Sequence, residues 1–302
     1  MSIFSTFMSE NEALIASNEL KESVNAKLQD YLLARSKGKK EAVLDFLLDY
    51  YAFRPTKLKV WSPGLLVEVE NTPRIRALLS PFKTIESATT ICLDASALIE
   101  KRRKHMQWVL ILQKSIAAKP PLFGCYGLHE WAMLYKSEQK RHPYLSLRVS
   151  QQLLDDTVEA NPLRCTHYDA YRFFTEPAVP LNEEPLAREE VLLFEQGGCI
   201  HNNMDLYKWS FKFYPWLPSE LIWKAFNLAL KARIVDMEAS PYDVRDYGYG
   251  AIEIEKPAGM KAYVHKQKEL ADEAAILRAQ WISEITAIIE FINSKTKIAN
   301  QV

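Results

Sequence analysis

The sequence is poor in glycine, which supplies only 9 of 302 residues against 15 prolines. So few glycines argue against a phosphate-cradling loop and against a turn-rich all-β fold. The chain also lacks the GxGxxG, GxxxxGK[ST] and GxSxG patterns of dinucleotide-binding, P-loop and α/β-hydrolase proteins. It has no HxE…PCxxC pattern either, so it shows no sign of a zinc deaminase.

The chain has no net charge, because 38 basic side chains balance 38 acidic ones. A dedicated nucleic-acid binder usually carries a basic excess, so tight non-specific DNA binding is not expected. Four cysteines are scattered along the chain without a CxxC pair, at Cys92, Cys125, Cys165 and Cys199. This spacing predicts free thiols in a reducing compartment rather than a disulfide framework.

The first residues show no basic segment followed by a long apolar one, so no signal peptide is predicted. The longest apolar runs, such as Trp108–Leu112, are far shorter than the roughly 20 residues that a membrane span needs. We therefore expect a cytoplasmic protein that has no membrane partner.

The periodicity of apolar residues predicts a mainly α fold. Helical spacing recurs in residues 10–52 (with a turn at 37–40), 95–117, 219–239 (with Ser219 as N-cap) and 262–294. Residues 58–69 are expected to form a hairpin and residues 251–255 a short strand. The prediction is one large helical domain over residues 1–302 with a small antiparallel β component. Its site-bearing segment spans about residues 123–243, and residues 262–294 form a C-terminal packing helix.

Histidines and cysteines concentrate in this central segment: residues 125–201 hold four of the six histidines and three of the four cysteines. Histidine titrates near neutral pH and binds metals, so such a cluster is a candidate site. In the first block, Phe123–Met133, His129 and Glu130 follow a glycine turn. Met133 stands where a zinc-protease motif needs its second histidine, which excludes that motif. The alternative is a buried structural histidine.

Two further blocks place histidine beside aspartate. In Arg164–Phe174, an extended chain would point His167 and Asp169 to the same face. In Gly197–Trp209, His201 and Asp205 lie four residues apart on one face of a helix. The asparagines between them either contact a ligand or cap a helix that begins near Met204. We expect all three blocks to converge on one pocket.

The words FGCYGLHEWAM, RCTHYDAYRFF and HNNMDLYKW, followed by Ser240–Asp243, resemble a bacterial family of about this length that is labelled 3-methyladenine DNA glycosylase. The resemblance covers most of the chain from about Ala42. It implies a DNA-repair hydrolase that releases an alkylated purine base from DNA. The chain has no glycine-rich hairpin like that of the helix-hairpin-helix glycosylases.

Such an enzyme needs a carboxylate near the sugar and aromatic side chains that stack on a flipped base. The candidate catalytic residues are Asp205, His201, His167, Asp169, His129 and Glu130. The candidate substrate-binding residues are Tyr126, Trp131, Tyr168, Asn203, Lys208, Trp209 and Tyr242. If Asp205 is the catalytic carboxylate, Asp205→Asn should lower activity and leave stability unchanged or higher.

Two other functions fit the same residues. The first is a metal-dependent or acid–base enzyme acting on a small molecule, in which His129, His167, His201 and Asp205 would be the metal ligands. The second is a helical binding module without catalysis. The sequence predicts no particular cofactor, and it does not indicate an oligomeric state.

Overall fold

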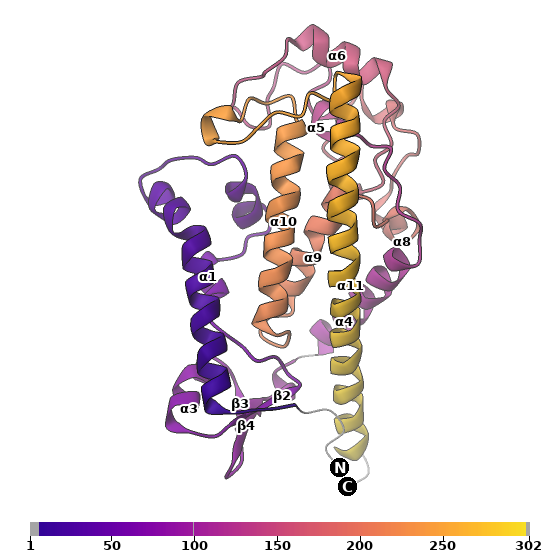
Figure 1. Ribbon diagram of the computed structural model, residues 1–302. Helices are drawn as coiled ribbons and strands as arrows, with labels where there is room; N and C mark the ends of the chain where they lie inside the picture. The colour runs from indigo at the N-terminus through magenta and orange to yellow at the C-terminus, as the bar shows by residue number, and fades with distance from the viewer. Residues whose placement is uncertain (1–5, 99, 300–302) are drawn as a thin grey trace.

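The computed structural model describes residues 6–98 and 100–299, with side chains as far as residue 295. The fold is mainly helical, as predicted, and its long helices run side by side (Figure 1). These are α1 (Glu10–Ser36), α4 (Glu100–Ala117), α9 (Ile200–Lys212), α10 (Ser219–Ala239) and α11 (Pro257–Ala299). None of the described helices is long and apolar enough to cross a membrane.

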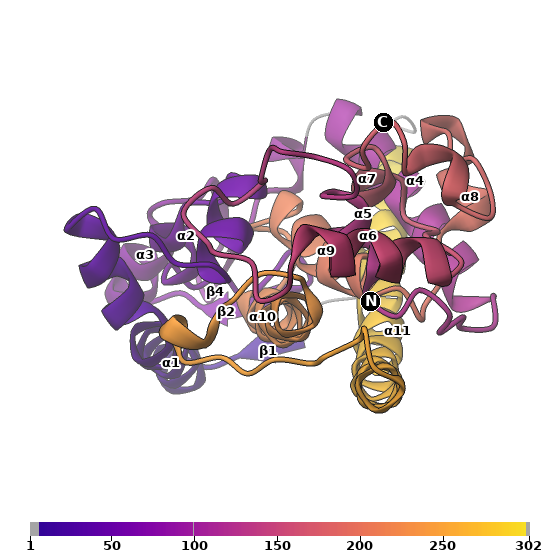
Figure 2. The same ribbon diagram turned by 90° about the horizontal axis from the view of Figure 1, so that it is seen from above.

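Shorter helical elements connect them: η1 (Phe46–Tyr50, a π-helical turn), α2 (Pro55–Leu58), α3 (Pro73–Leu79), η2 (Ala95–Ala97), α5 (Leu128–Ala132), α6 (Gln151–Ala160), α7 (Tyr168–Tyr171), η3 (Val179–Leu181), η4 (Arg188–Glu190), α8 (Val191–Phe194) and η5 (Arg245–Tyr247). Figure 2 shows α1 to α3 on one side of α10 and α4 to α8 on the other. The short helices of residues 128–194 therefore lie on the opposite side of α10 from α1 to α3.

The small sheet lies at the end of the molecule where α1 begins (Figure 1). Its strands β1 (Thr6–Met8), β2 (Val67–Glu70), β3 (Thr84–Glu86) and β4 (Thr90–Leu93) are ordered β1-β2-β4-β3. β1 pairs with β2 in parallel and the other pairs are antiparallel, so the sheet is mixed rather than wholly antiparallel.

Of the two remaining predicted strand segments, residues 251–255 form no strand, and residues 58–69 do so only where they enter β2. Backbone groups of both segments bond instead to the two ends of α10. Pro55 begins a helical turn instead of a strand. Ser62 exchanges hydrogen bonds with Ser219, whose hydroxyl accepts the Ser62 N–H at 2.8 Å rather than capping α10. At the other end, the Ile252 N–H donates to the Glu238 carbonyl at 2.7 Å, so residues 251–255 form no strand.

The turn predicted at residues 37–40, within the helical stretch 10–52, is confirmed. α1 ends at Ser36, and Gly38 takes φ 75°, a left-handed conformation that glycine adopts without steric cost. Only η1 continues the helical pattern. The apolar stripe predicted for residues 262–294 lies inside α11 and is buried against α4, α9 and α10. Trp281 on this stripe is fully buried.

Candidate functional site

The three sequence blocks meet around His201, but their candidate side chains line three cavities rather than the one pocket that was predicted. α5 carries His129, the start of α7 follows His167, and α9 carries His201 in its first turn. The ring centroids of His129 and His201 are 4.2 Å apart, and those of His167 and His201 are 5.6 Å apart. Three imidazoles from distant parts of the chain therefore form one contiguous buried group.

A tight turn aims His129 at α10. Tyr126 and Gly127 both have positive φ, 48° and 77°, directly before α5. A Cβ atom at Gly127 would lie 3.0 Å from the Tyr263 ring of α11, so the turn is pressed against that helix. Only glycine fits this turn without a shift of its neighbours.

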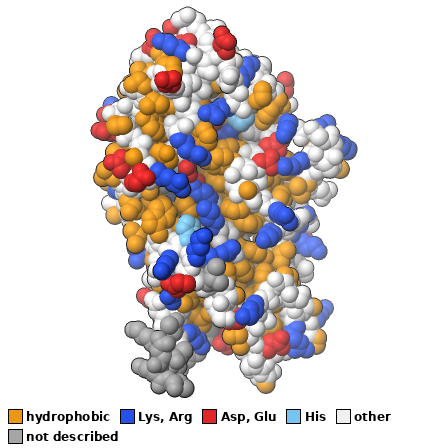
Figure 3. Space-filling model, turned by 180° about the vertical axis from the view of Figure 1, so that it is seen from behind, with side chains coloured by type: hydrophobic (Ala, Val, Ile, Leu, Met, Phe, Trp, Pro, Cys, Tyr) orange, Lys and Arg blue, Asp and Glu red, His pale blue; other side chains and the backbone are white. Residues whose placement is uncertain are grey.

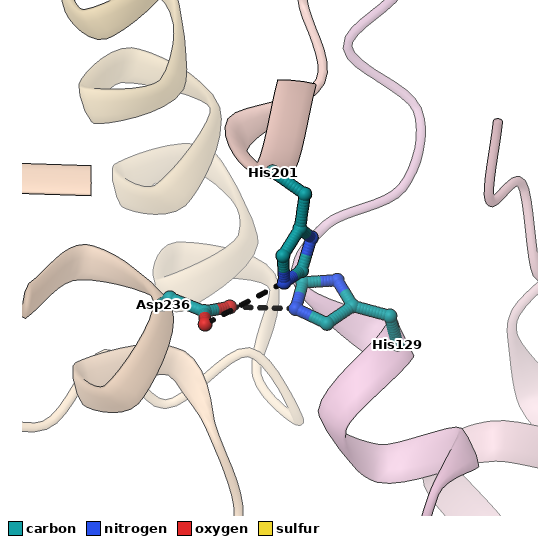
Figure 4. A group of neighbouring side chains, drawn as sticks. All are labelled: His129, His201 and Asp236. Carbon is teal, nitrogen blue, oxygen red and sulfur yellow. Dashed lines mark hydrogen bonds and ion pairs between the residues drawn. The ribbon is translucent and has the colours of Figure 1, made fainter. Parts of the chain in front are cut away.

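His129 is paired with Asp236 of α10. Its Nε2 atom lies 2.6 Å from Asp236 Oδ1, and both side chains are almost fully buried (Figure 4). Arg233, one turn earlier on α10, pairs with Asp236 and with Glu130 at 2.8 Å. Burial disfavours a charged ring, but the Asp236 carboxylate outweighs burial and raises the pKa of His129 to about 10. His129 is therefore cationic at neutral pH.

His201 lies between the other two histidines in the opposite state. Its Nε2 atom faces the same carboxylate as that of His129, at 3.8 Å from Asp236 Oδ2 (Figure 4). Burial, reinforced by the positive charge of His129, lowers the pKa of His201 well below its ordinary value. The group thus holds one charged and one neutral imidazole in ring contact.

His167 belongs to a second chain of polar contacts. Its Nδ1 atom pairs with Glu195 at 2.8 Å, and Glu195 accepts the Asn202 amide at 2.7 Å. Asn202 in turn accepts a hydrogen bond from Arg278 of α11 at 2.7 Å. Burial opposes the charged ring, but Glu195 raises the pKa of His167. His167 has an extended backbone directly before α7, but Asp169 lies within that helical turn, so the two residues do not share one face of an extended chain.

Asp205 is held by an aromatic hydroxyl and a lysine. Tyr51 donates to Asp205 at 3.1 Å, and Lys208 pairs with both Asp205 and Asp169. Burial would raise the pKa of Asp169, but Lys208 outweighs it, and the pKa lies below its ordinary value. Both candidate carboxylates therefore share one buried ammonium group.

Three cavities open onto these groups. The thiol cavity, of about 680 Å³, is lined by His129, His201 and the cysteines Cys125, Cys165 and Cys199. The arginine cavity, of about 200 Å³, is lined by Glu130, His167, His201, Asp169, Asp205 and Arg233. The lysine cavity, of about 360 Å³, is lined by His167, Tyr168, Asp169, Asp205, Lys208 and Trp209. His201 faces the first two cavities, and His167 the last two.

Two groups of three side chains have ligand atoms within 4.8 Å of one another: His129, His201 and Asp236, and His167, Asp169 and Asp205. The four metal ligands expected from the sequence are thus divided between two groups. In each group a cation already pairs with the carboxylates: the buried Arg233 in the first and the largely buried Lys208 in the second. Such carboxylates fit an internal ion pair better than a metal ion. We assign no metal to these residues.

Four of the candidate substrate-binding residues lie outside these three cavities. Trp131 is fully buried, and its indole N–H donates to the Ala239 carbonyl at 2.9 Å. The buried Tyr242 hydroxyl accepts the backbone N–H of Arg141 at 3.1 Å. Asn203 lies inside α9, bonded to Gly197 and Arg278, rather than capping a later helix. Tyr126 forms the strained turn before α5.

The sequence interpretation missed Asp236, Arg233 and Glu195. A signal for the first two was present, because Arg233 continues the apolar stripe that runs through Phe226 and Ala229 of α10, and a charged residue on such a stripe must find a buried partner. Glu195 lies just after the short helix α8, and no pattern in the sequence sets it apart.

No family model, curated protein or solved structure matches this chain. The resemblance to 3-methyladenine DNA glycosylases stays a prediction.

Proposed function

We propose that the protein is a hydrolase that acts on a small molecule in the thiol cavity, with His129 and His201 as its acid–base pair. The observation that carries the proposal is the contact between these two imidazoles on the wall of one cavity, with Asp236 facing both. A pair of titratable groups held in opposite protonation states supplies a proton donor and a proton acceptor in one place.

The environment of each ring supports its role. The Asp236 carboxylate keeps His129 protonated, which suits a donor of a proton to a leaving group. His201 stays neutral at physiological pH, so it can accept a proton from water. Arg233 and the protonated His129 together balance the charges of Asp236 and Glu130, so the buried cluster holds two cationic and two anionic groups.

The cavity itself supports a small substrate. A volume of about 680 Å³ is in the range that holds small ligands, and apolar side chains supply much of its wall, among them Leu122, Phe123, Leu193 and Phe194. Polar side chains also line the cavity, His129 and His201 among them, and these two would orient the reacting bond.

The test is turnover of chromogenic esters, amides and glycosides by the wild type and by two single variants, His129→Gln and His201→Gln. Loss of a general acid or base typically costs a hundredfold or more in rate, and we expect each variant to show this loss. His265→Gln is the matched control, because His265 is exposed on α11 and touches no cavity described above. Full turnover in both site variants would contradict the proposal.

The lysine cavity favours a second candidate, the base-releasing glycosylase that the resemblance implies. Asp169 and Asp205 lie beside Tyr168 and Trp209 there, which supplies a carboxylate and aromatic faces in one cavity. Lys and Arg side chains form a row among hydrophobic ones on the face shown in Figure 3, which would suit phosphate groups in spite of the zero net charge.

Release of 3-methyladenine from alkylated DNA tests this candidate. Wild-type release that falls about a hundredfold in Asp205→Asn would support it. No release, under conditions in which a known glycosylase works, would leave the small-molecule hydrolase as the function.

A further inference from the structure

Cys125 is set apart from the other cysteines by its surroundings. It is partly exposed on the wall of the thiol cavity, whereas Cys165 and Cys199 are buried. Its thiol and the His129 ring line the same cavity, four residues apart in the chain, and the amide of Gln267 lies 3.7 Å from its Sγ atom. His129 Nε2 is engaged by Asp236, so Nδ1 is the ring atom that remains for the thiol.

We propose that Cys125, His129 and Asp236 form a nucleophile–imidazole–carboxylate triad, and that the substrate is an amide or ester of a small apolar acid. This inference rests on the proposed function, since it uses the same cavity and the same proton donor. A cysteine beside an imidazole that a carboxylate orients is the usual arrangement for covalent acyl transfer.

Charge at the thiol agrees with this arrangement. Burial would raise the pKa of Cys125, but the hydrogen bond and the positive charge of His129 outweigh it, and the pKa lies below its ordinary value. Burial raises the pKa of Cys165 to about 12, and that of Cys199 well above its ordinary value. The half-buried Cys92, far from the histidines, also has a raised pKa.

The reaction balances with water as the only co-reactant. The Cys125 thiolate attacks the acyl carbon, and the carbon–nitrogen or carbon–oxygen bond breaks as His129 gives its proton to the leaving amine or alcohol. The product on the enzyme is a thioester. Water then attacks this thioester while His201 or the now neutral His129 takes its proton, the carbon–sulfur bond breaks, and the carboxylic acid leaves. The proton returns to His129, which restores the ion pair.

The walls of the cavity indicate the acyl group. Leu122, Phe123, Leu193 and Phe194 line it together with Cys125, so an apolar acyl chain can lie on them while its carbonyl carbon meets the sulfur.

The experiment measures thiol reactivity and acyl trapping in the full-length protein. Iodoacetamide labelling of each cysteine is followed against pH by peptide mass spectrometry, with Cys92 as the internal control thiol. We expect Cys125 to react with a pH midpoint below that of Cys92, and His129→Gln to slow its labelling at about pH 7 by tenfold or more. With p-nitrophenyl acetate, the wild type and Cys92→Ser should gain one acetyl group that hydroxylamine removes, and Cys125→Ala should gain none.

The outcomes separate this inference from the proposed function. Labelling of Cys125 with the same pH midpoint as Cys92, or acetyl transfer to another residue, overturns the triad. If turnover depends on His129 and His201 but no acetyl group is found on Cys125, the hydrolase stands and the thiol is not its nucleophile. If Cys125 is acetylated while His201→Gln keeps full turnover, the triad stands and His201 is not the base. If Cys125→Ala does not fold, a folded Cys125→Ser variant takes its place in both measurements.

Discussion

His129 Nε2 lies 2.6 Å from Asp236 Oδ1, and neither side chain reaches bulk solvent. With Arg233 and Glu130, the pair forms a buried cluster of two cations and two anions. Such a cluster is stable only while each charge keeps its partner, because an unpaired buried charge costs several kcal/mol. The proton on His129 is therefore part of the fold as well as of the proposed chemistry.

Stability should fall at alkaline pH. The pKa of His129 is raised in the folded protein to about 10, against about 6.5 in an unfolded chain. The stability that its proton contributes is thus fully present below about pH 6.5 and is lost as the pH rises through about 10. Urea unfolding between pH 7 and 10 should show a steeper fall for the wild type than for His129→Gln. Equal slopes for the two proteins would contradict this assignment.

Asp205→Asn should destabilise the protein by about 1–3 kcal/mol, because a charge-assisted hydrogen bond to Lys208 is lost while Lys208 stays buried. This differs from the expectation drawn from the sequence, in which the carboxylate had no partner and its removal relieved a burial cost. Denaturant unfolding measures the change. Glu220→Gln, at an exposed position on α10, is the control. If Asp205→Asn is as stable as the wild type, Asp169 alone is a sufficient partner for Lys208.

Trp281→Ala should cost about 3–5 kcal/mol, as expected for a fully buried aromatic side chain. The Trp281 ring packs beside Phe213, with centroids 6.1 Å apart, so its loss would open a cavity under α11. Ile276→Ala is the matched control on the exposed face of the same helix. An unchanged unfolding midpoint for Trp281→Ala would mean that α11 is not part of the cooperative core.

Dialysis against a chelator should leave the unfolding midpoint unchanged, because Arg233 and Lys208 already neutralise the carboxylates of both ligand-like groups. Elemental analysis of protein purified without an affinity-tag metal measures occupancy directly. If the wild type holds one equivalent of zinc or iron and His201→Gln holds none, the histidines form a metal centre rather than an acid–base pair.

Much of the fold could be predicted from the sequence, because the long helices bury regular apolar stripes. The stripe through Leu277, Trp281 and Ile285 is an example, since its spacing of three and four residues is a local property of the chain. Local apolar spacing did not predict the structure of residues 58–69 correctly, where a hairpin was expected. The hydrogen bonds between Ser62 and Ser219 join positions 157 residues apart, so a local sequence pattern cannot predict them.

The residues of the candidate site could likewise be predicted only in part. His129, His167 and His201 could be proposed because histidine is rare and chemically distinctive. Asp236, which pairs with His129 across 107 residues, lies in a helix that otherwise follows a simple apolar pattern. The role of a buried carboxylate depends on the cation that it meets, and that partner is set by packing of the whole chain.

The protonation states of His129 and His201 decide whether the two rings can act as an acid–base pair. Nitrogen NMR of histidine-labelled protein reports whether one or both ring nitrogens carry a proton, and spectra of His129→Gln and His201→Gln assign the two rings. At about pH 7.5 we expect a doubly protonated His129, which titrates only near pH 10, beside a His201 with a single proton. A His129 that titrates near its ordinary pKa of about 6.5, or a His201 that is charged at neutral pH, would contradict it.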